Sequence, residues 1–331
     1  MPRKMMNSIC NMKNIWLKFL LLAAAVGCSK TAVDTGSLEQ DGGRSLITFS
    51  VSSSTKVTGD QTSREKVVNT LQVFVYNEDG SMDASSERMD SSSVIISCGI
   101  GKKVVAAVVN APEISPEDVR TLDELKAVPS SLTDNRPGGF VMFGKETITL
   151  SARATVKVPV KRLVSKIVLS QIDRDFDDPV AAAKPLIIKG VSLKHVAGSY
   201  TLGGVAPAEE VWYNDVQNEK IEEPESVKNL IADYDLDFPL VQSGAYETPH
   251  CFYSYPNDAG SKVTILSVET LFSGMVAYYP IALPALEPNK IYILTNLKLT
   301  RQGGAFDDED TIIFDIEVKD WETGAEWEEI Y

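Results

Sequence analysis

Alternating apolar and polar residues mark most of this chain as β-strand. In residues 46–53, LITFSVSS, the side chains of Ile47, Phe49 and Val51 fall on one face, and Ser and Thr residues fall on the other. This period of two is typical of a half-buried strand. Residues 71–80 repeat the pattern and end in the turn sequence NEDG, as expected for a strand that leads into a hairpin.

Short runs of the same kind, separated by turn residues, continue along the chain. They are SSVIISCGI, KKVVAAVVN, ETITLSARATVKVPV, KRLVSKIVLSQI, LIIKGVSLKHV, KVTILSVETLF, MVAYYPIAL, KIYILTNLKLT and TIIFDIEVKDW. A helical period is evident in residues 115–128, where Ser115 would cap the helix and Pro116 would lie in its first turn. We therefore predict an all-β protein of packed antiparallel sheets with one short helix.

The length of the chain favours two domains. About 300 residues follow the N-terminal segment discussed below, which is more than one sandwich usually holds. A loop-like cluster of charges and prolines, QIDRDFDDPVAAAKP, follows a run of strands, and we place the boundary slightly before it, near Lys161. The predicted organisation is one β-sandwich at residues 45–161 and a second at residues 162–331.

The N-terminal segment has the pattern of an export signal. Its apolar run, residues 19–27, is less than half of the roughly 20 residues that a membrane-spanning helix needs. Basic residues without acidic ones precede this run, as in a secretory signal peptide. Residues 25–28, AVGC, resemble the bacterial lipobox, so residues 1–27 are predicted to be a lipoprotein signal peptide and Cys28 the acylated, palmitate-bearing residue. An ordinary signal peptide that ends at a chance cysteine is the alternative.

Two further features complete the description of this segment. Residues 28–44 are polar and contain glycine, without hydrophobic periodicity, so we expect a flexible tether between the lipid and the first strand. Either Met1 or Met12 could be the true start, because a start at Met12 gives a signal peptide of more usual length.

The net negative charge of the chain limits the classes of partner that it can bind. The chain has 32 basic and 46 acidic residues, a formal net charge of −14. Without the four basic residues of the signal peptide the balance is about −18. Such a surface repels nucleic acids and anionic lipids, so we expect no nucleic-acid partner and attachment to a membrane only through the lipid on Cys28.

The residues that could carry chemistry are few. Cys98 and Cys251 could pair, but two buried thiols are the commoner outcome at this separation. His195 and His250 belong to no spaced set of ligands, so structural or surface positions and no metal are expected. The acidic run at 306–311, FDDEDT, lacks the spacing of an EF-hand loop, and a solvated hairpin tip is favoured over a Ca²⁺ site.

No enzymatic activity is expected. The sequence has no nucleophile elbow, phosphate loop or paired His/Cys constellation, which are the short motifs that would indicate catalysis. No cofactor is expected apart from the covalent lipid on Cys28. The aromatic stretch at 250–257, HCFYSYPN, could pack a strand, or it could present Tyr253 and Tyr255 to a sugar ring.

Taken in order, the lipobox, the tether and the strands resemble the fimbrillins, the type V pilin family of Gram-negative gut and oral bacteria. The resembling stretches after the first strand are VVNTLQVFVYNEDG, KKVVAAVVNAP, TLDELKAV, FVMFGK, KRLVSKIVLS, VSLKHVAGSYTLGG, YYPIALPALEPNKIYILTNLKLTRQGG and IEVKDWETG. The resemblance implies two transthyretin-like β-sandwiches in tandem. It also implies a structural or adhesive fimbrial subunit, exported to the outer membrane as a lipoprotein and assembled at the cell surface.

The resemblance also implies a mode of assembly. In fimbrillins a trypsin-like protease removes the first strand, and the terminal strand of a neighbouring subunit replaces it. Here the displaced strand would carry Ile47, Phe49 and Val51, and the polar linker behind it contains the candidate cleavage residue Arg64. The arginine that the family has soon after the first strand is replaced by Lys56, and Arg64 could instead be only a solvated loop residue.

Two other segments complete the hypothesis. Cleavage after Arg44 would cut the tether and keep the first strand. The C-terminal residues 320–331 are the candidate donor strand, because Trp321 and Trp327 share a face when extended and Tyr331 follows. The alternative is that this segment ends the C-terminal sandwich and that its tryptophans fill that sandwich's own core.

The predicted partners are other fimbrial subunits, in a homopolymer or heteropolymer, and the maturation protease. The surface ligand is not specified by the sequence. Two alternatives stay open. One is an anchor or tip subunit that does not polymerise, and the other is a lipid-anchored glycan-binding protein of the outer membrane.

Overall fold

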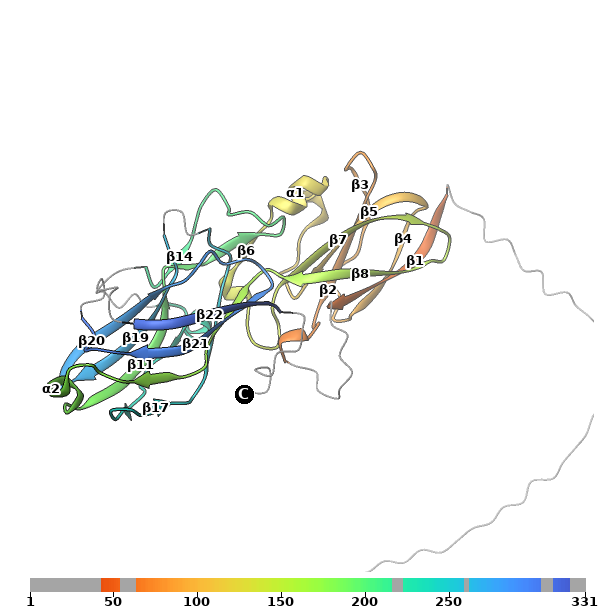
Figure 1. Ribbon diagram of the computed structural model, residues 1–331. Coiled ribbons are helices and arrows are strands. Elements are labelled where there is room, and N and C mark those ends of the chain that lie inside the picture. Colours follow the sequence, from red (N-terminus) through yellow and green to blue (C-terminus); the bar gives the residue numbers. More distant parts are fainter. Residues whose placement is uncertain (1–42, 54–63, 216–222, 259–261, 305–311, 322–331) are drawn as a thin grey trace, which may run out of the picture. The chain divides into compact units, whose positions relative to one another are not determined.

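The computed structural model describes residues 43–53, 64–215, 223–258, 262–304 and 312–321. Over these residues most of the chain is β-strand (Figure 1), so the predicted all-β class is confirmed. Within them, no helix has the length and apolar composition needed to cross a bilayer.

The first group of strands forms two facing sheets that are joined through β8. The strands are β1 (Arg44–Ser53), β2 (Leu71–Tyr76), β3 (Met82–Ser85), β4 (Ser93–Gly99), β5 (Gly101–Val109), β7 (Met142–Leu150) and β8 (Thr155–Arg162). Their order is β3-β2-β5-β7-β8-β1-β4. β8 pairs with β1 over most of its length and with β7 only at Lys161 and Arg162, so it passes from one sheet to the other.

The alternation read from the sequence explains the core between these two sheets. β4 alternates exposed and buried residues along Ser93–Cys98, and β8 does so from Lys157 to Arg162. The inward side chains of both sheets form one cluster, which includes Ile47, Phe49, Val73, Val75, Val94, Ile96, Val105, Val158 and Val160. Burial of these apolar side chains is the main stabilising contribution in this part of the chain.

The remaining strands form two larger sheets and two short pairs. One sheet contains β9 (Ser165–Leu169), β10 (Ile172–Arg174), β17 (Ala245–Tyr246), β18 (His250–Ser254), β21 (Lys290–Leu299) and β22 (Ile312–Asp320). The other contains β11 (Leu186–Lys194), β15 (Ala232–Asp233), β16 (Phe238–Pro239), β19 (Ile265–Phe272) and β20 (Met275–Ala282). The short pairs are β12 (Val196–Ala197) with β14 (Trp212–Tyr213), and β6 (Pro129–Ser131) with β13 (Ser199–Thr201). β22 pairs with β21, whose other side carries β9 and β10, so β22 lies at an edge.

The helix predicted at residues 115–128 is divided in two. Pro116–Asp118 forms a 3-10 turn, η2, in which the Ser115 side chain makes no capping bond. The α-helix proper, α1 (Leu122–Ala127), begins after Thr121, which forms a capping box with Glu124. That reciprocal cap satisfies two backbone donors and fixes a new helix start.

Two more α-helices and two more 3-10 turns lie in the described part of the chain. They are α2 (Pro179–Ala182), α3 (Glu225–Ile231), η1 (Arg64–Lys66) and η3 (Leu132–Asp134). α2 lies in the segment predicted as a loop and is capped by the Asp178 carboxylate. α3 buries Val227, Leu230 and Ile231, which have helical spacing.

The hydrophobic core continues from the first group of strands into the second. β8 ends at Arg162 and β9 begins at Ser165, close to the predicted boundary at Lys161. However, Phe74 and Tyr76 of β2 belong to the same buried cluster as Trp321. The described residues from Gly43 to Trp321 also belong to one compact unit. The division into two domains therefore stays a prediction.

Candidate functional site

β1 occupies a slot between two other strands, which we call the β1 slot. It pairs antiparallel with β4, from Arg44 opposite Gly99 to Ser50 opposite Ser93. On its other edge it pairs in parallel with β8 over residues 48–53. In the described strands β4 joins the sheet only through β1. Removal of β1 would therefore leave two unpaired strand edges, one strand apart.

The β1 side chains alternate as the sequence predicts. Ile47 and Phe49 are completely buried between the two sheets, and Val51 is half-buried against the same cluster. Leu46, on the opposite face, is 63% exposed. Complete burial of a side chain such as Ile or Phe contributes about 1.5–3 kcal/mol. β1 is thus held by its core side chains as well as by two ladders of backbone hydrogen bonds.

Arg44, at the start of β1, is engaged in ionic contacts. Its Nη1 atom lies 2.8 Å from Asp83 Oδ1, and its Nη2 atom donates to the Ser97 carbonyl at 2.7 Å. Burial alone would raise the pKa of Asp83, but hydrogen bonds from Lys103 and from the Gly99 amide, with the charge of Arg44, hold it below its ordinary value. A protease that accepts the Arg44 side chain would first have to break these contacts.

Arg64 and its neighbour Glu65 have opposite environments. Arg64 is exposed at the start of η1, whereas Glu65 is only 3% exposed. Glu65 Oε1 accepts hydrogen bonds from Lys166 Nζ and from the Tyr253 hydroxyl, both at 2.7 Å. Glu65 Oε2 accepts one from Trp321 Nε1 at 3.0 Å. Glu65, which follows the predicted cleavage residue Arg64, is therefore held in the core by these hydrogen bonds.

We call Glu65, Arg162, Lys166, Tyr253 and Trp321 the Glu65 cluster. Arg162 Nε donates to the Glu65 carbonyl at 2.9 Å, and its guanidinium carbon lies 4.5 Å from the centre of the Trp321 ring. Tyr253 stacks on Trp321 with ring centroids 5.9 Å apart. Burial alone would raise the pKa of Glu65, but the charge and hydrogen bond of Lys166 and the bonds from Tyr253 and Trp321 lower it. Glu65 is therefore ionised at neutral pH.

The Glu65 cluster joins the turn that follows the linker to the last described residue of the chain. Glu65 is the second described residue after the linker at residues 54–63, and Trp321 is the last described residue. The structure thus places Trp321 in the chain's own core, as the alternative interpretation holds. Trp327 and Tyr331 lie outside the described residues, as do Cys28 and the acidic run at 306–311, so the donor hypothesis depends on Trp327 and Tyr331.

The other residues singled out from the sequence have structural roles. Tyr253 and Tyr255 are both buried and cannot present their rings to a sugar, which removes the platform of the glycan-binding alternative. The Tyr255 hydroxyl contacts Ser130 Oγ and the Asn135 amide. Burial raises the pKa of Tyr255.

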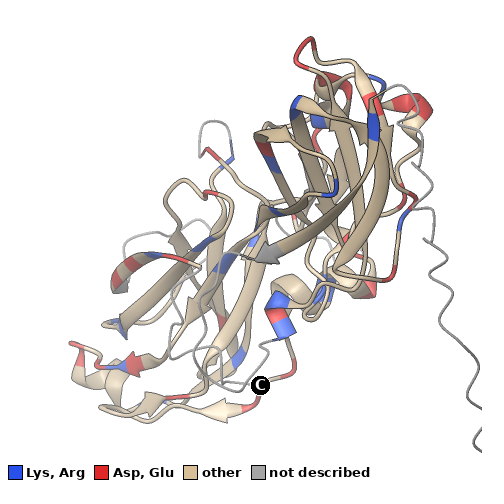
Figure 2. Ribbon diagram, turned by 90° about the vertical axis from the view of Figure 1, so that its right-hand side faces the viewer, with Lys and Arg blue, Asp and Glu red and all other residues tan. Residues whose placement is uncertain are grey.

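The histidines and cysteines are also explained by local packing. The His250 ring bonds to Asp233 Oδ2 at 2.6 Å and to the Tyr246 hydroxyl at 3.0 Å, and His195 Nδ1 lies 3.1 Å from a backbone carbonyl. Cys98 is a free, buried thiol, so it is not joined to Cys251. Among the described residues, no three His, Cys, Asp or Glu side chains are grouped as a metal site would require. Figure 2 shows acidic and basic residues interspersed over strands and loops.

Residues 46–167 match the family model of the major fimbrial subunit protein FimA. By this match, the N-terminal part of the chain is similar to the fimbrillin family. The matched segment contains the whole β1 slot together with Glu65, Arg162 and Lys166, whereas Tyr253 and Trp321 lie beyond it. The predicted relationship to the fimbrillins is confirmed. No curated protein matches the chain.

Solved structures extend the likeness in fold beyond the fimbrillin match. Two are candidate cell adhesion proteins, one from Parabacteroides distasonis (16% identity, TM-score 0.62) and one from Bacteroides eggerthii (18%, 0.62), each with 85% of this chain and 97% of the other covered. A fimbrilin, FimA, from Porphyromonas gingivalis has 12% identity and a TM-score of 0.59, with 84% and 97% covered. At these identities the likeness shows the fold.

Proposed function

We propose that this chain is a structural and adhesive fimbrial subunit that is assembled by exchange of β1. The observation that carries the proposal is the position of β1. It is the first strand of the folded body, it fills a slot between β4 and β8, and its core side chains Ile47 and Phe49 are completely buried. Because β1 precedes the other strands, it can leave the slot without threading any segment through a loop.

An empty β1 slot is a strong acceptor for another strand. It presents the unpaired backbone groups of β4 and β8 together with the apolar sites vacated by Ile47 and Phe49. A strand from a second subunit could pair with both β4 and β8 and place apolar side chains, at alternate positions, in the vacated core. This is β-augmentation in which the added strand pairs along both of its edges. The match to the fimbrial subunit family supports this use of the slot.

The proposal includes a route to the cell surface. The chain is exported as a lipoprotein, acylated at Cys28 and held at the outer membrane by its lipid. A trypsin-like protease then cuts after Arg64, which frees the body from β1 and the lipid together. Exposure of Arg64 supports this site. A cut after Arg44 would leave β1 in place and yield a subunit that cannot accept a donor.

The donor segment is proposed to follow Trp321. Trp321 is buried and hydrogen-bonded to Glu65. It would therefore hold the start of the donor segment against the core of its own subunit. The residues that enter a neighbour's slot then come after it, with Trp327 and Tyr331 as the apolar anchors. The protein has no catalytic role in this scheme, and its partners are other fimbrial subunits and the maturation protease.

The experiment uses the mature chain with Cys28→Ser, which removes the lipid, and limited digestion by trypsin. Intact mass identifies the cut, and size-exclusion chromatography with electron microscopy follows assembly. We expect loss of residues up to Arg64 and growth into polymers, which deletion of residues 322–331 abolishes. A variant in which Lys56, Arg64 and Lys66 are all replaced by Gln should stay monomeric, because trypsin cuts after lysine as well as arginine. A cut body that remains monomeric would contradict the proposal and would favour the anchor or tip subunit.

A peptide gives a second, independent test of the slot. Excess peptide of residues 44–53 should refill the slot of the cut subunit and stop polymer growth. The matched control is the same peptide with Ile47→Asp and Phe49→Asp, which keeps the backbone groups but cannot enter the apolar core. If both peptides stop growth equally, the β1 slot is not the assembly site.

A further inference from the structure

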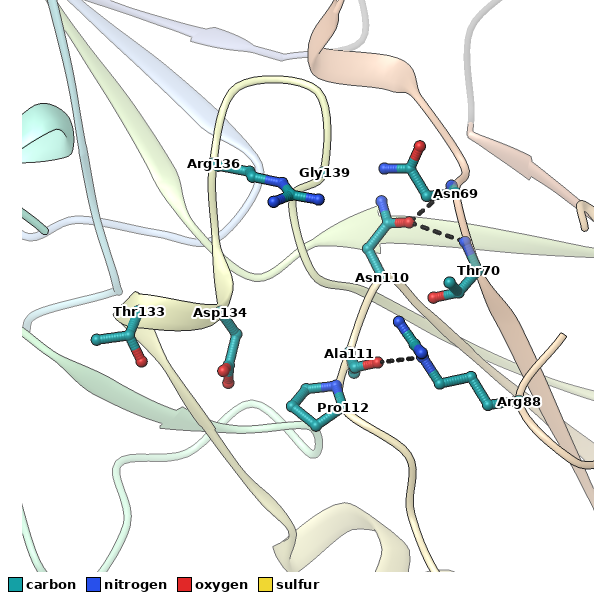
Figure 3. A pocket seen from close by; sticks show the side chains of 10 residues that line it. All are labelled: Asn69, Thr70, Arg88, Asn110, Ala111, Pro112, Thr133, Asp134, Arg136 and Gly139. Atoms are coloured by element: carbon teal, nitrogen blue, oxygen red, sulfur yellow. Dashed lines mark hydrogen bonds between the residues drawn. The ribbon is translucent and has the colours of Figure 1, made fainter. Parts of the chain in front are cut away.

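A polar hollow lies on the surface near the start of β2 (Figure 3). Its volume is about 260 Å³, and it is open to solvent. Four segments line it: the approach to β2, the loop at Arg88, the turn after β5, and the segment from η3 to Gly139. The lining residues are Asn69, Thr70, Arg88, Asn110, Ala111, Pro112, Thr133, Asp134, Arg136 and Gly139.

The floor of the hollow is held rigidly by Asn110. Its Oδ1 atom accepts hydrogen bonds from the backbone amides of Asn69 and Thr70 at 2.8 and 3.2 Å. Its Nδ2 atom donates to the carbonyls of Val67 and Phe140 at 2.7 and 3.0 Å. One side chain thus fixes three lining segments before any ligand arrives, and such preorganisation lowers the entropic cost of binding.

Two arginines from different segments reach the hollow. Arg88 Nε donates to the Ala111 carbonyl at 3.0 Å, which fixes the guanidinium group. The two terminal nitrogens, Nη1 and Nη2, take no part in that hydrogen bond. The carbonyl of Arg136 accepts a hydrogen bond from the Gly139 amide at 2.9 Å, whereas its guanidinium forms no hydrogen bond or ion pair with the part of the chain that the structure describes. Figure 3 shows the two side chains approaching from opposite sides of Asn110 and Ala111.

Gly139 keeps space beside Arg136. A Cβ atom at this position would lie 3.2 Å from Asn69 Nδ2 and 3.4 Å from Arg136 Nε. The contact with the Asn69 amide is tight and the contact with Arg136 is at ordinary van der Waals distance, so a larger residue would push the Asn69 amide aside. The small residue therefore keeps Arg136 next to the Asn69 amide, which is itself anchored to the Gly138 carbonyl at 2.6 Å.

Acceptors complete the lining. Asp134 uses Oδ2 to cap the Ser131 amide at 2.9 Å, and Asn69 donates through Nδ2. This leaves Asp134 Oδ1 and Asn69 Oδ1 as acceptors for donors on a ligand. The hollow thus combines two guanidinium groups with carboxylate and amide oxygens. The chain as a whole has a net charge of −14, which repels anions elsewhere.

We propose that this hollow binds one carboxylate-bearing sugar residue of a surface glycan. A guanidinium fork matches a carboxylate with two parallel hydrogen bonds, and the ring hydroxyls would donate to Asp134 and Asn69. The volume is just below the roughly 300 Å³ at which pockets for larger ligands begin, which suits a single ring. Asp134 repels a doubly charged phosphate more than a single carboxylate.

This inference rests on the adhesive role proposed above, since it names the class of ligand that the subunit would hold. Its test needs no assembly. If binding fails while cut subunits still polymerise, only the ligand assignment is lost. If binding succeeds while polymerisation fails, the sugar site stands and the assembly scheme is wrong.

The test titrates the mature Cys28→Ser chain with glucuronate, glucose and inorganic phosphate, followed by calorimetry and amide NMR shifts. We expect saturable binding of glucuronate and shifts at residues 69–70, 110–112 and 133–139, with glucose and phosphate weaker by roughly tenfold or more. Equal binding of glucuronate and glucose, or tighter binding of phosphate, would overturn the proposal.

Variants locate the site. Arg88→Gln and Arg136→Gln should each weaken glucuronate by roughly tenfold, because each removes a charged donor. The matched control is Arg120→Gln, an exposed arginine outside the hollow, which should bind as the parent does. Unfolding curves establish that the variants fold. An affinity unchanged in both Arg88→Gln and Arg136→Gln would exclude the hollow.

Discussion

Replacement of Glu65 by Gln should release the turn that carries Arg64. Glu65 is buried and faces Lys166, which is only 1% exposed. The amide of Gln keeps the volume of the side chain and one acceptor oxygen but removes the negative charge. In the closed form Lys166 would then be buried without a counter-charge. If η1 lifts away, water reaches Lys166, so the open form does not carry this cost.

The size of the effect follows from the burial of the pair. Removal of one partner from a buried ion pair costs about 3–5 kcal/mol, and the lower end applies because Gln can still accept a hydrogen bond. Cleavage of a bond that must first open locally follows the population of the open form. At about 1.4 kcal/mol per tenfold change in that population, cleavage after Arg64 should be roughly 100-fold faster.

The assay is limited digestion of the mature Cys28→Ser chain by trypsin, with the rate of the product that begins at residue 65 read by intact mass. The control is Glu78→Gln. Glu78 pairs with Lys102 at 2.6 Å, but both side chains are more than half exposed, so their pair contributes at most about 1 kcal/mol. An unchanged rate at Arg64 in Glu65→Gln would refute the reasoning. Equal acceleration at every site would show global unfolding instead.

Three further outcomes are expected. Phe49→Ala should lower the free energy of unfolding in urea by about 3–5 kcal/mol, whereas Leu46→Ala, on the exposed face of the same strand, should change it by less than about 0.5 kcal/mol; similar losses would contradict the inward assignment of Phe49. Because Glu65 has a lowered pKa in the folded state, its stabilisation is complete above its ordinary value of 4.5 and is lost as pH falls through the folded value. The stability difference between the parent and Glu65→Gln should therefore be constant above about pH 5.5 and shrink in acid; a difference that grows in acid would refute the assignment. Cys98 is buried opposite Ser45 of β1, and burial raises the pKa of its thiol, so iodoacetamide should modify it slowly in the intact chain and rapidly once β1 has been removed.

The sequence predicts those parts of the fold that depend on local patterns. The alternation of Ile47, Phe49 and Val51 gave the inward face of β1 correctly, because burial on one side of a sheet requires a period of two. The positions of the helices are harder to predict from the sequence. The spacing of Val227, Leu230 and Ile231 is helical and would have indicated α3, but the run is too short to stand out.

The Glu65 cluster could not be predicted in the same way. Glu65 lies in a polar stretch, and its partners are 97 to 256 residues away in the chain. Glu, Lys and Arg are rarely buried unless paired, so each of these residues is expected at the surface when it is considered alone. Trp321 shows the same limit, because its position on one face of an extended segment fits its own core and a neighbour's slot equally well.

The two-sided pairing of β1 also has a mechanical consequence. A strand held between β4 and β8 is bonded along both edges, so a force applied along its axis acts on all of these hydrogen bonds at once. A strand held at one edge and pulled sideways would lose its bonds one after another. A donor strand in the β1 slot would therefore be loaded in shear when the fibre is stretched, and each joint would resist tension without a covalent link between subunits.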